Sequence, residues 1–175
     1  MLELPEHCSP GPDQQDLCLG AVTSPPDSSK QLIDTYGTYG LLYNWFPYEA
    51  QEIRKITDKP RSEFFAIGHN FLGSVLIQRW YAYEQTLVIL LQGVGRRRIL
   101  KIDLPEVTDL PQGRDTLAGA MQQVERTERV LKLHWRAVNE RRDPQWPDKF
   151  RKLDAQSEQI RAAALVILEQ LLHER

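Results

Sequence analysis

The sequence has only two cysteines, Cys8 and Cys18, and both lie near its N-terminus. A disulfide between them would cross-link only a short N-terminal stretch, so we expect reduced thiols and a cytoplasmic location. His7 lies beside Cys8, but three such residues at this spacing match no standard zinc site. The sequence therefore predicts neither a disulfide framework nor a metal centre.

Catalytic motifs are also missing. His69 and His134 are the internal histidines, and neither lies near a nucleophile motif or in an inward-facing Glu-x-x-His pair. Residues 93–95 (GVG) precede three arginines but lack the lysine and Ser/Thr of a P-loop. We interpret them as a helix end followed by a turn. The sequence thus predicts no catalytic residue and no cofactor, and an enzyme is the least supported class.

No stretch is typical of a membrane segment. Residues 71–91 are long enough to cross a bilayer, but Gln78, Arg79, Glu84 and Gln85 lie in their middle. The N-terminus carries acids and prolines where a signal peptide needs a basic start and an apolar run. We expect no membrane span and no signal peptide.

The first thirty residues are rich in proline and poor in apolar periodicity. Such a segment buries too little apolar surface to offset the entropy of ordering. We predict a flexible acidic tail over 1–30 and a single domain over 31–175. Removal of residues 1–29 should then leave stability nearly unchanged.

Residues 62–92 predict a central helix. Their polar side chains gather in one stripe when plotted at about 100° per residue, whereas alternation of period two fails around Gln78 and Arg79. Gly68, Gly73 and the aromatic and β-branched content oppose this interpretation, and a break at either glycine stays open. A helix apolar around most of its circumference needs other helices around it.

The last third predicts an antiparallel helical hairpin. Apolar residues recur at helical spacing over 117–138 and over 150–171, and two prolines in 141–147 forbid one continuous helix. A short helix or irregular wrap is expected over 32–43, a short helix over 47–57, and an extended crossover without a strand partner over 99–104. The predicted fold is an all-α, irregular bundle of four to five helices with a long central helix and this C-terminal hairpin.

Aromatic residues concentrate between Tyr36 and Tyr48, and tyrosine and tryptophan often anchor protein interfaces. These side chains could equally cover the long helix. We predict a non-catalytic adaptor, assembly factor or small structural subunit whose partner is another protein or a second copy of the chain. The candidate contact residues are Tyr36, Tyr39, Trp45, Tyr48 and Trp146.

The alternative is a helical subunit that binds nucleic acid. Net charge is only −2, but it is uneven, at about −5 over 1–63 and about +5 over 94–152. Basic side chains in the crossover and at the turn of the hairpin could contact phosphates. They could equally form an ordinary solvated surface. The candidates are Arg96, Arg97, Arg98, Lys101, Arg141, Arg142, Lys149, Arg151 and Lys152.

Overall fold

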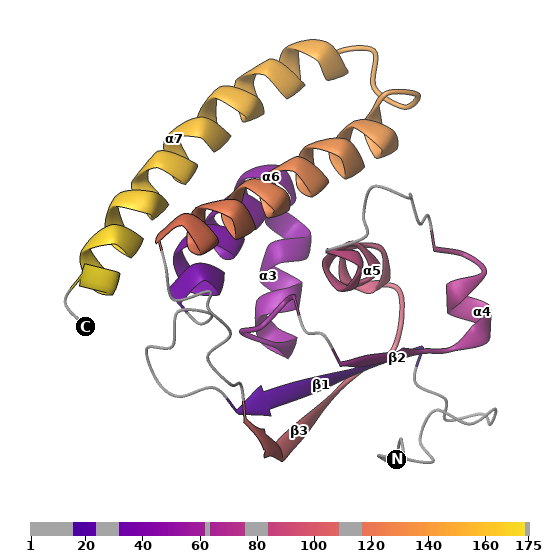
Figure 1. Ribbon diagram of the computed structural model, residues 1–175. Helices are drawn as coiled ribbons and strands as arrows, with labels where there is room; N and C mark the ends of the chain where they lie inside the picture. The colour runs from indigo at the N-terminus through magenta and orange to yellow at the C-terminus, as the bar shows by residue number, and fades with distance from the viewer. Residues whose placement is uncertain (1–15, 24–31, 62–63, 76–83, 109–116, 174–175) are drawn as a thin grey trace.

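The computed structural model describes residues 16–23, 32–61, 64–75, 84–108 and 117–173. They form an α+β fold in which a small sheet lies at one end and a long helical hairpin at the other (Figure 1). Helices α3 and α5 lie between the two. The all-α prediction is therefore wrong, because three segments pair as strands.

The sheet has the order β2-β1-β3. Strand β1 (Leu17–Thr23) is central, antiparallel to β2 (Phe65–Ile67) and parallel to β3 (Ile99–Thr108). Leu17 faces Ile67 on one side and Ile99 on the other. Residues 99–104 are extended as predicted, but they pair with β1 and are not a crossover without a partner.

Strand β1 belongs to the stretch that we expected to be a flexible tail. Leu17, Cys18 and Leu19 are all buried, so both faces of the strand are covered. A strand buried on both faces shows no alternation of apolar and polar residues, which is why the pattern gave no strand signal. The other residues of 1–30, apart from Asp16, lie outside the described ranges.

The predicted helix over 62–92 is also wrong. Its N-terminal part forms β2 and the short α4 (His69–Leu72), and its C-terminal part forms α5 (Gln85–Gly93). Gly68, between β2 and α4, has extended backbone angles, with φ −65° and ψ 143°. Residues 76–83 lie outside the described ranges. Helix α5 does end at Gly93 as expected, and its apolar residues from Leu87 to Leu91 are buried.

Three consecutive helical segments follow the second gap in the described chain. A π-helical turn η2 (Ile33–Thr38) continues into α2 (Tyr39–Trp45), and α3 (Pro47–Ile56) follows directly. Pro47 occupies the start of α3, where its missing N–H is not needed. Of the two alternatives for 32–43 the helical one is thus confirmed, and the helix expected over 47–57 is present.

The C-terminal hairpin is confirmed. Helix α6 (Leu117–Asn139) and helix α7 (Trp146–His173) run antiparallel along one side of the molecule (Figure 1). Leu131 of α6 and Leu168 of α7 are fully buried in the main core. Within the described ranges, every helix is too short or too polar to span a bilayer.

Candidate functional site

Two exposed tyrosines stand on η2 and α2. Tyr36 is 40 % exposed and Tyr43 is 41 % exposed, so the side chains of both are accessible to a partner. They are seven residues apart, about two helical turns, so both lie on the same side of this helix. We call the surface formed by Tyr36, Tyr43 and the nearby Arg54 the tyrosine face.

Tyr39 supports the tyrosine face from below. It is buried, its ring lies 6.2 Å from the ring of Tyr43, and the Arg54 guanidinium lies 4.5 Å from its ring centroid. Its hydroxyl donates a hydrogen bond to the Thr57 carbonyl. Burial raises the pKa of Tyr39 above its ordinary value, although Arg54 acts in the opposite direction. The phenol therefore stays protonated and remains a donor, and it fixes α2 against the end of α3.

Trp45, another predicted contact residue, belongs to the core. Its ring lies 5.3 Å from that of Phe150 and 6.0 Å from that of Trp135. Its indole nitrogen donates to the Ser157 hydroxyl at 3.1 Å. This buried tryptophan ties α2 to both arms of the hairpin, and it is not accessible to a partner.

The other two predicted aromatic contacts differ in exposure. Tyr48 is 63 % exposed, and its hydroxyl lies beside Gly95 in the turn between α5 and β3. Gly95 has φ +73°, a conformation that side chains with a Cβ rarely adopt. Trp146 is half-buried against Phe150 at the start of α7, with the Arg136 guanidinium 5.3 Å from its ring. Tyr48 is thus available to a partner, and Trp146 is partly covered.

The predicted basic cluster is divided into two groups. Arg96, Arg97, Arg98 and Lys101 belong to the sheet end of the molecule, whereas the hairpin turn lies at the opposite end of the view (Figure 1). The hairpin group consists of Arg141, Arg142, Lys149, Arg151 and Lys152. A single continuous phosphate-binding surface that uses both groups is not formed.

Several of these basic side chains have acidic partners. In the hairpin group, Lys149 pairs with Asp143 at 2.7 Å, and Arg151 pairs with Asp148. The pKa of Asp143 is lowered because Lys149 and the backbone of Gln145 donate hydrogen bonds to it. Such exposed pairs are typical of a solvated helix surface.

The sheet-end group is paired in the same way. Arg97 lies 3.9 Å from Asp16 and donates to the Ser74 hydroxyl, and Lys101 pairs with Asp103 at 3.2 Å. Arg96 and Arg98 are exposed in the same turn, whose Gly95 lies beside the Tyr48 side chain. This turn is the one place in the described chain where predicted basic residues and a predicted exposed aromatic meet.

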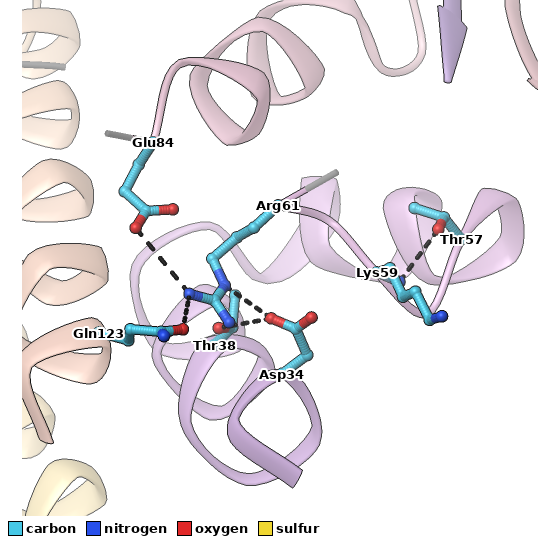
Figure 2. Close-up of polar contacts among 7 residues, drawn as sticks. All are labelled: Asp34, Thr38, Thr57, Lys59, Arg61, Glu84 and Gln123. Atoms are coloured by element: carbon cyan, nitrogen blue, oxygen red, sulfur yellow. Dashed lines mark hydrogen bonds and ion pairs between the residues drawn. The ribbon is translucent and has the colours of Figure 1, made fainter. Parts of the chain in front are cut away.

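Sequence reasoning missed a buried polar cluster around Arg61 (Figure 2). Arg61 donates through Nε to Asp34 at 2.6 Å and through a terminal nitrogen to Gln123 at 2.9 Å, and Glu84 lies 4.0 Å away. Thr38 adds a hydrogen bond to Asp34 at 3.1 Å. The cluster joins η2, the loop after α3, the start of α5 and α6.

The side chains of this cluster are almost completely buried, as is typical of residues that stabilise a fold. The side chains of Arg61, Asp34 and Glu84 are 8 %, 2 % and 5 % exposed. Two carboxylates share one guanidinium, and the hydrogen bonds from Thr38 and Arg61 compensate part of their desolvation. A signal was present in the sequence, since Asp34 interrupts an apolar helical stretch, but its partners are distant along the chain.

A second polar network, centred on the buried Glu128, crosses the hairpin. Glu128, which is buried, pairs with Lys132 at 2.9 Å and with Arg161 at 2.8 Å, and Lys132 also pairs with Asp154. Burial lowers the pKa of Lys132, but hydrogen bonds to Asp154 and Glu128 outweigh it and raise the pKa overall. These bonds set the register of α6 against α7.

The internal histidines, His69 and His134, differ in their surroundings. His134 is buried with its ring 5.5 Å from that of Phe46, and burial lowers its pKa to about 4. It is therefore neutral at ordinary pH. His69 is exposed on α4. Among the described residues, no group of three or more His, Cys, Asp or Glu side chains could hold a metal ion.

Comparison of this chain with protein-family models, with curated proteins and with solved structures found no match to any of them.

Proposed function

We propose that the chain is a non-catalytic protein-interaction module, an adaptor, assembly factor or small structural subunit of a cytoplasmic complex. The tyrosine face is its contact surface, and the observation that carries the proposal is the exposure of Tyr36 and Tyr43 on one side of a helix. Tyrosine and arginine are enriched where partners bind tightly, because they offer large contact areas with polar ends.

The support beneath these residues favours the same proposal. The buried ring of Tyr39 contacts Tyr43 and Arg54 of this surface, which favours their ordering before any partner arrives. A preorganised surface loses less side-chain entropy on binding. In the cluster around Arg61 and in the network around Glu128, ionisable side chains from different elements form ion pairs within each group. Such pairs are typical of residues that stabilise a fold.

Site-directed photo-crosslinking tests the proposal. A benzophenone-bearing amino acid replaces Tyr43 in cells of the source, and the matched control carries it at Val166, which is 54 % exposed on α7. We expect a discrete cross-linked adduct with a protein at position 43 and not at 166. The variant Tyr36→Ala/Tyr43→Ala should not compete for the same partner. Equal cross-linking at both positions, or none at position 43, would contradict the proposal.

The turn at Tyr48 favours a second candidate function, binding of single-stranded nucleic acid. Arg96 and Arg98 can contact phosphates, and the exposed ring of Tyr48 can stack on a base. An oligonucleotide titration by fluorescence anisotropy at several salt concentrations tests it. Binding that weakens with salt, and that Tyr48→Ala or Arg96→Ala reduces, supports this candidate. Lack of binding at low salt eliminates it.

A further inference from the structure

Strand β3 lies at the edge of the sheet. It contains ten residues, and on one side it pairs with β1. Within the described ranges no strand pairs with its other side (Figure 1). Such an edge exposes backbone donors and acceptors that another strand can use.

The hydrogen bonds of β1 show which residues of β3 face outward. Leu17 donates its N–H to the carbonyl of Arg98, whereas Gly20 donates to Phe64, which precedes β2. In a parallel ladder, both backbone groups of one residue point to the same neighbour. Even-numbered residues of β3 therefore face β1, and the groups of Ile99, Lys101 and Asp103 face the open edge.

The side chains along this edge have opposite charges. Those of Lys101 and Asp103 are 37 % and 79 % exposed, and they lie two residues apart on the same face of the strand. On the opposite face, Leu100, Ile102 and Leu104 are half-buried. The edge therefore combines a basic and an acidic residue with an apolar row.

This pattern is complementary to itself. When two copies of β3 pair antiparallel, the residues whose backbone groups face the open edge must lie opposite each other. The registers that satisfy this condition differ by steps of two residues. With Ile102 opposite its own copy, Lys101 faces the partner's Asp103, and Asp103 faces the partner's Lys101. A shift in either direction places Lys101 against Lys101, or Asp103 against Asp103, which is repulsive. Charge therefore selects one register.

We infer that two copies of the chain pair antiparallel through β3, with Ile102 on the two-fold axis. Each Lys101 and the partner's Asp103 exchange both backbone hydrogen bonds, and they form an ion pair in place of the one that Lys101 and Asp103 make within a single chain. Leu100 then faces the partner's Leu104 on the apolar side, in a closely spaced pair without hydrogen bonds. Pro105 has no N–H to donate to the partner's Ile99, so the pairing ends there.

The assembly that results is isologous and closed, because both copies use the same edge. Two three-stranded sheets become one continuous sheet. Charged residues and proline on an edge can also serve to prevent pairing, and the experiment below separates the two roles. The inference goes beyond the tyrosine face, whose residues it does not use.

A charge-swap experiment on the full-length chain tests the inference. Lys101→Asp places two acids opposite two acids, and Asp103→Lys places two bases opposite two bases. Both positions are exposed, so neither substitution disturbs the core. Sedimentation equilibrium of the wild-type chain should show a dimer, and each variant should dimerise at least about tenfold more weakly.

The decisive sample is an equimolar mixture of the two variants. The mixture restores opposite charges at both facing positions, so a heterodimer should form with affinity close to that of the wild type. A wild-type chain that stays monomeric would overturn the inference, and the charged edge would then act to prevent pairing. Variants that dimerise as strongly as the wild type, or a mixture no stronger than its components, would also overturn it.

Disulfide trapping tests the register independently. In a Cys8→Ser/Cys18→Ala background, Ile102→Cys places two thiols across the two-fold axis at a spacing of about 4.5 Å between Cα atoms, which a disulfide can bridge. Leu100→Cys on the same face is the matched control, because its counterpart lies farther along the strand. Under mild oxidation we expect several-fold more dimer from position 102. Equal yields would contradict the register.

Discussion

The Nε atom of Arg61 lies 2.6 Å from Oδ1 of Asp34, and both side chains are almost inaccessible to water (Figure 2). This bond joins the loop after α3 to the π-helical turn η2, which are adjacent in space but separated in sequence by helices α2 and α3. Glu84 from the start of α5 approaches the same guanidinium. A single residue thus connects three parts of the helical layer.

Replacing Arg61 should destabilise the fold severely. Arg61→Met removes the only guanidinium of the described cluster and leaves Asp34 and Glu84 buried without it. Breaking a buried ion pair from one side typically costs about 3–5 kcal/mol. Urea denaturation followed by circular dichroism should show this loss in the free energy of unfolding.

Two further variants serve as controls for the effect of Arg61→Met on stability. Arg151→Ala disrupts an exposed ion pair with Asp148 and should change stability little. Arg61→Met/Asp34→Asn removes a charge from both sides and should recover part of the loss. A cluster that tolerates Arg61→Met as well as Arg151→Ala would show that the buried bonds contribute little.

His134 should make stability depend on pH in the acidic range. Burial lowers its pKa from 6.5 to about 4 in the folded chain. Between pH 6.5 and pH 4, the unfolded chain binds more protons at His134 than the folded chain does. The contribution of His134 to the free energy of unfolding is therefore fully present above pH 6.5 and is lost as pH falls toward 4. This pKa shift corresponds to about 3 kcal/mol in the free energy of unfolding.

Urea denaturation between pH 7.5 and pH 4.5 measures this loss. Carboxylates also titrate in this range, so the comparison is with His134→Gln, which keeps them and removes the imidazole. The variant should lose less stability than the wild type between pH 6.5 and pH 4.5. Parallel curves for the two proteins would show that His134 is not the responsible group.

The sequence predicted the elements whose signal is local. Helices α6 and α7 repeat their apolar residues at helical spacing, and proline marks the turn between them, so both were found. Helix α3 was found because Pro47 starts it and its charges follow the helix dipole. These features lie within a few residues of one another, and pattern reasoning can use them.

The sheet could not be predicted in the same way. Leu17 pairs with Ile99, and the two residues lie more than eighty positions apart. Neither strand alternates in a way that identifies its partner, and a short apolar segment near a proline-rich stretch resembles a tail. Once β1 was missed, β3 had no visible partner, and the polar stripe in residues 62–92 favoured a helix over a pair of strands.

The candidate site was predicted in part. The aromatic segment was found, but sequence cannot separate Tyr39, which is buried, from Tyr36 and Tyr43, which are exposed. All three have helical spacing, and only the packing of α3 and Arg54 decides which one is covered. Tyr43 was not among the predicted contacts for this reason.

Gly37 should be required by its close approach to α6. A Cβ at this position would lie 2.7 Å from Cγ2 of Val124, which is fully buried and has little room to move. Gly37→Ala should therefore lower the free energy of unfolding by about 1–3 kcal/mol through overpacking. Thermal or urea denaturation measures the change.

A double-mutant cycle identifies the cause. Val124→Ala alone removes buried methyl groups and should also destabilise. The double variant Gly37→Ala/Val124→Ala should lose less stability than the two single losses added together, because the new methyl group occupies the vacated space. Strict additivity would show that the two residues do not contact each other.

Deletion of residues 1–29 should unfold the sheet end of the molecule, opposite to what the composition of this segment indicates. The deletion removes the central strand, so β2 and β3 lose their shared partner and the core loses Leu17 and Leu19, which are 0 % and 2 % exposed.

Leu19→Asp is the corresponding point substitution, since it places an unpaired charge in the core. Circular dichroism should show loss of cooperative melting for both variants. Arg151→Ala, at an exposed position of α7, is the control and should melt like the wild type. A deleted chain that melts at the wild-type temperature would show that β1 contributes nothing to the stability of the fold, and that the composition was right.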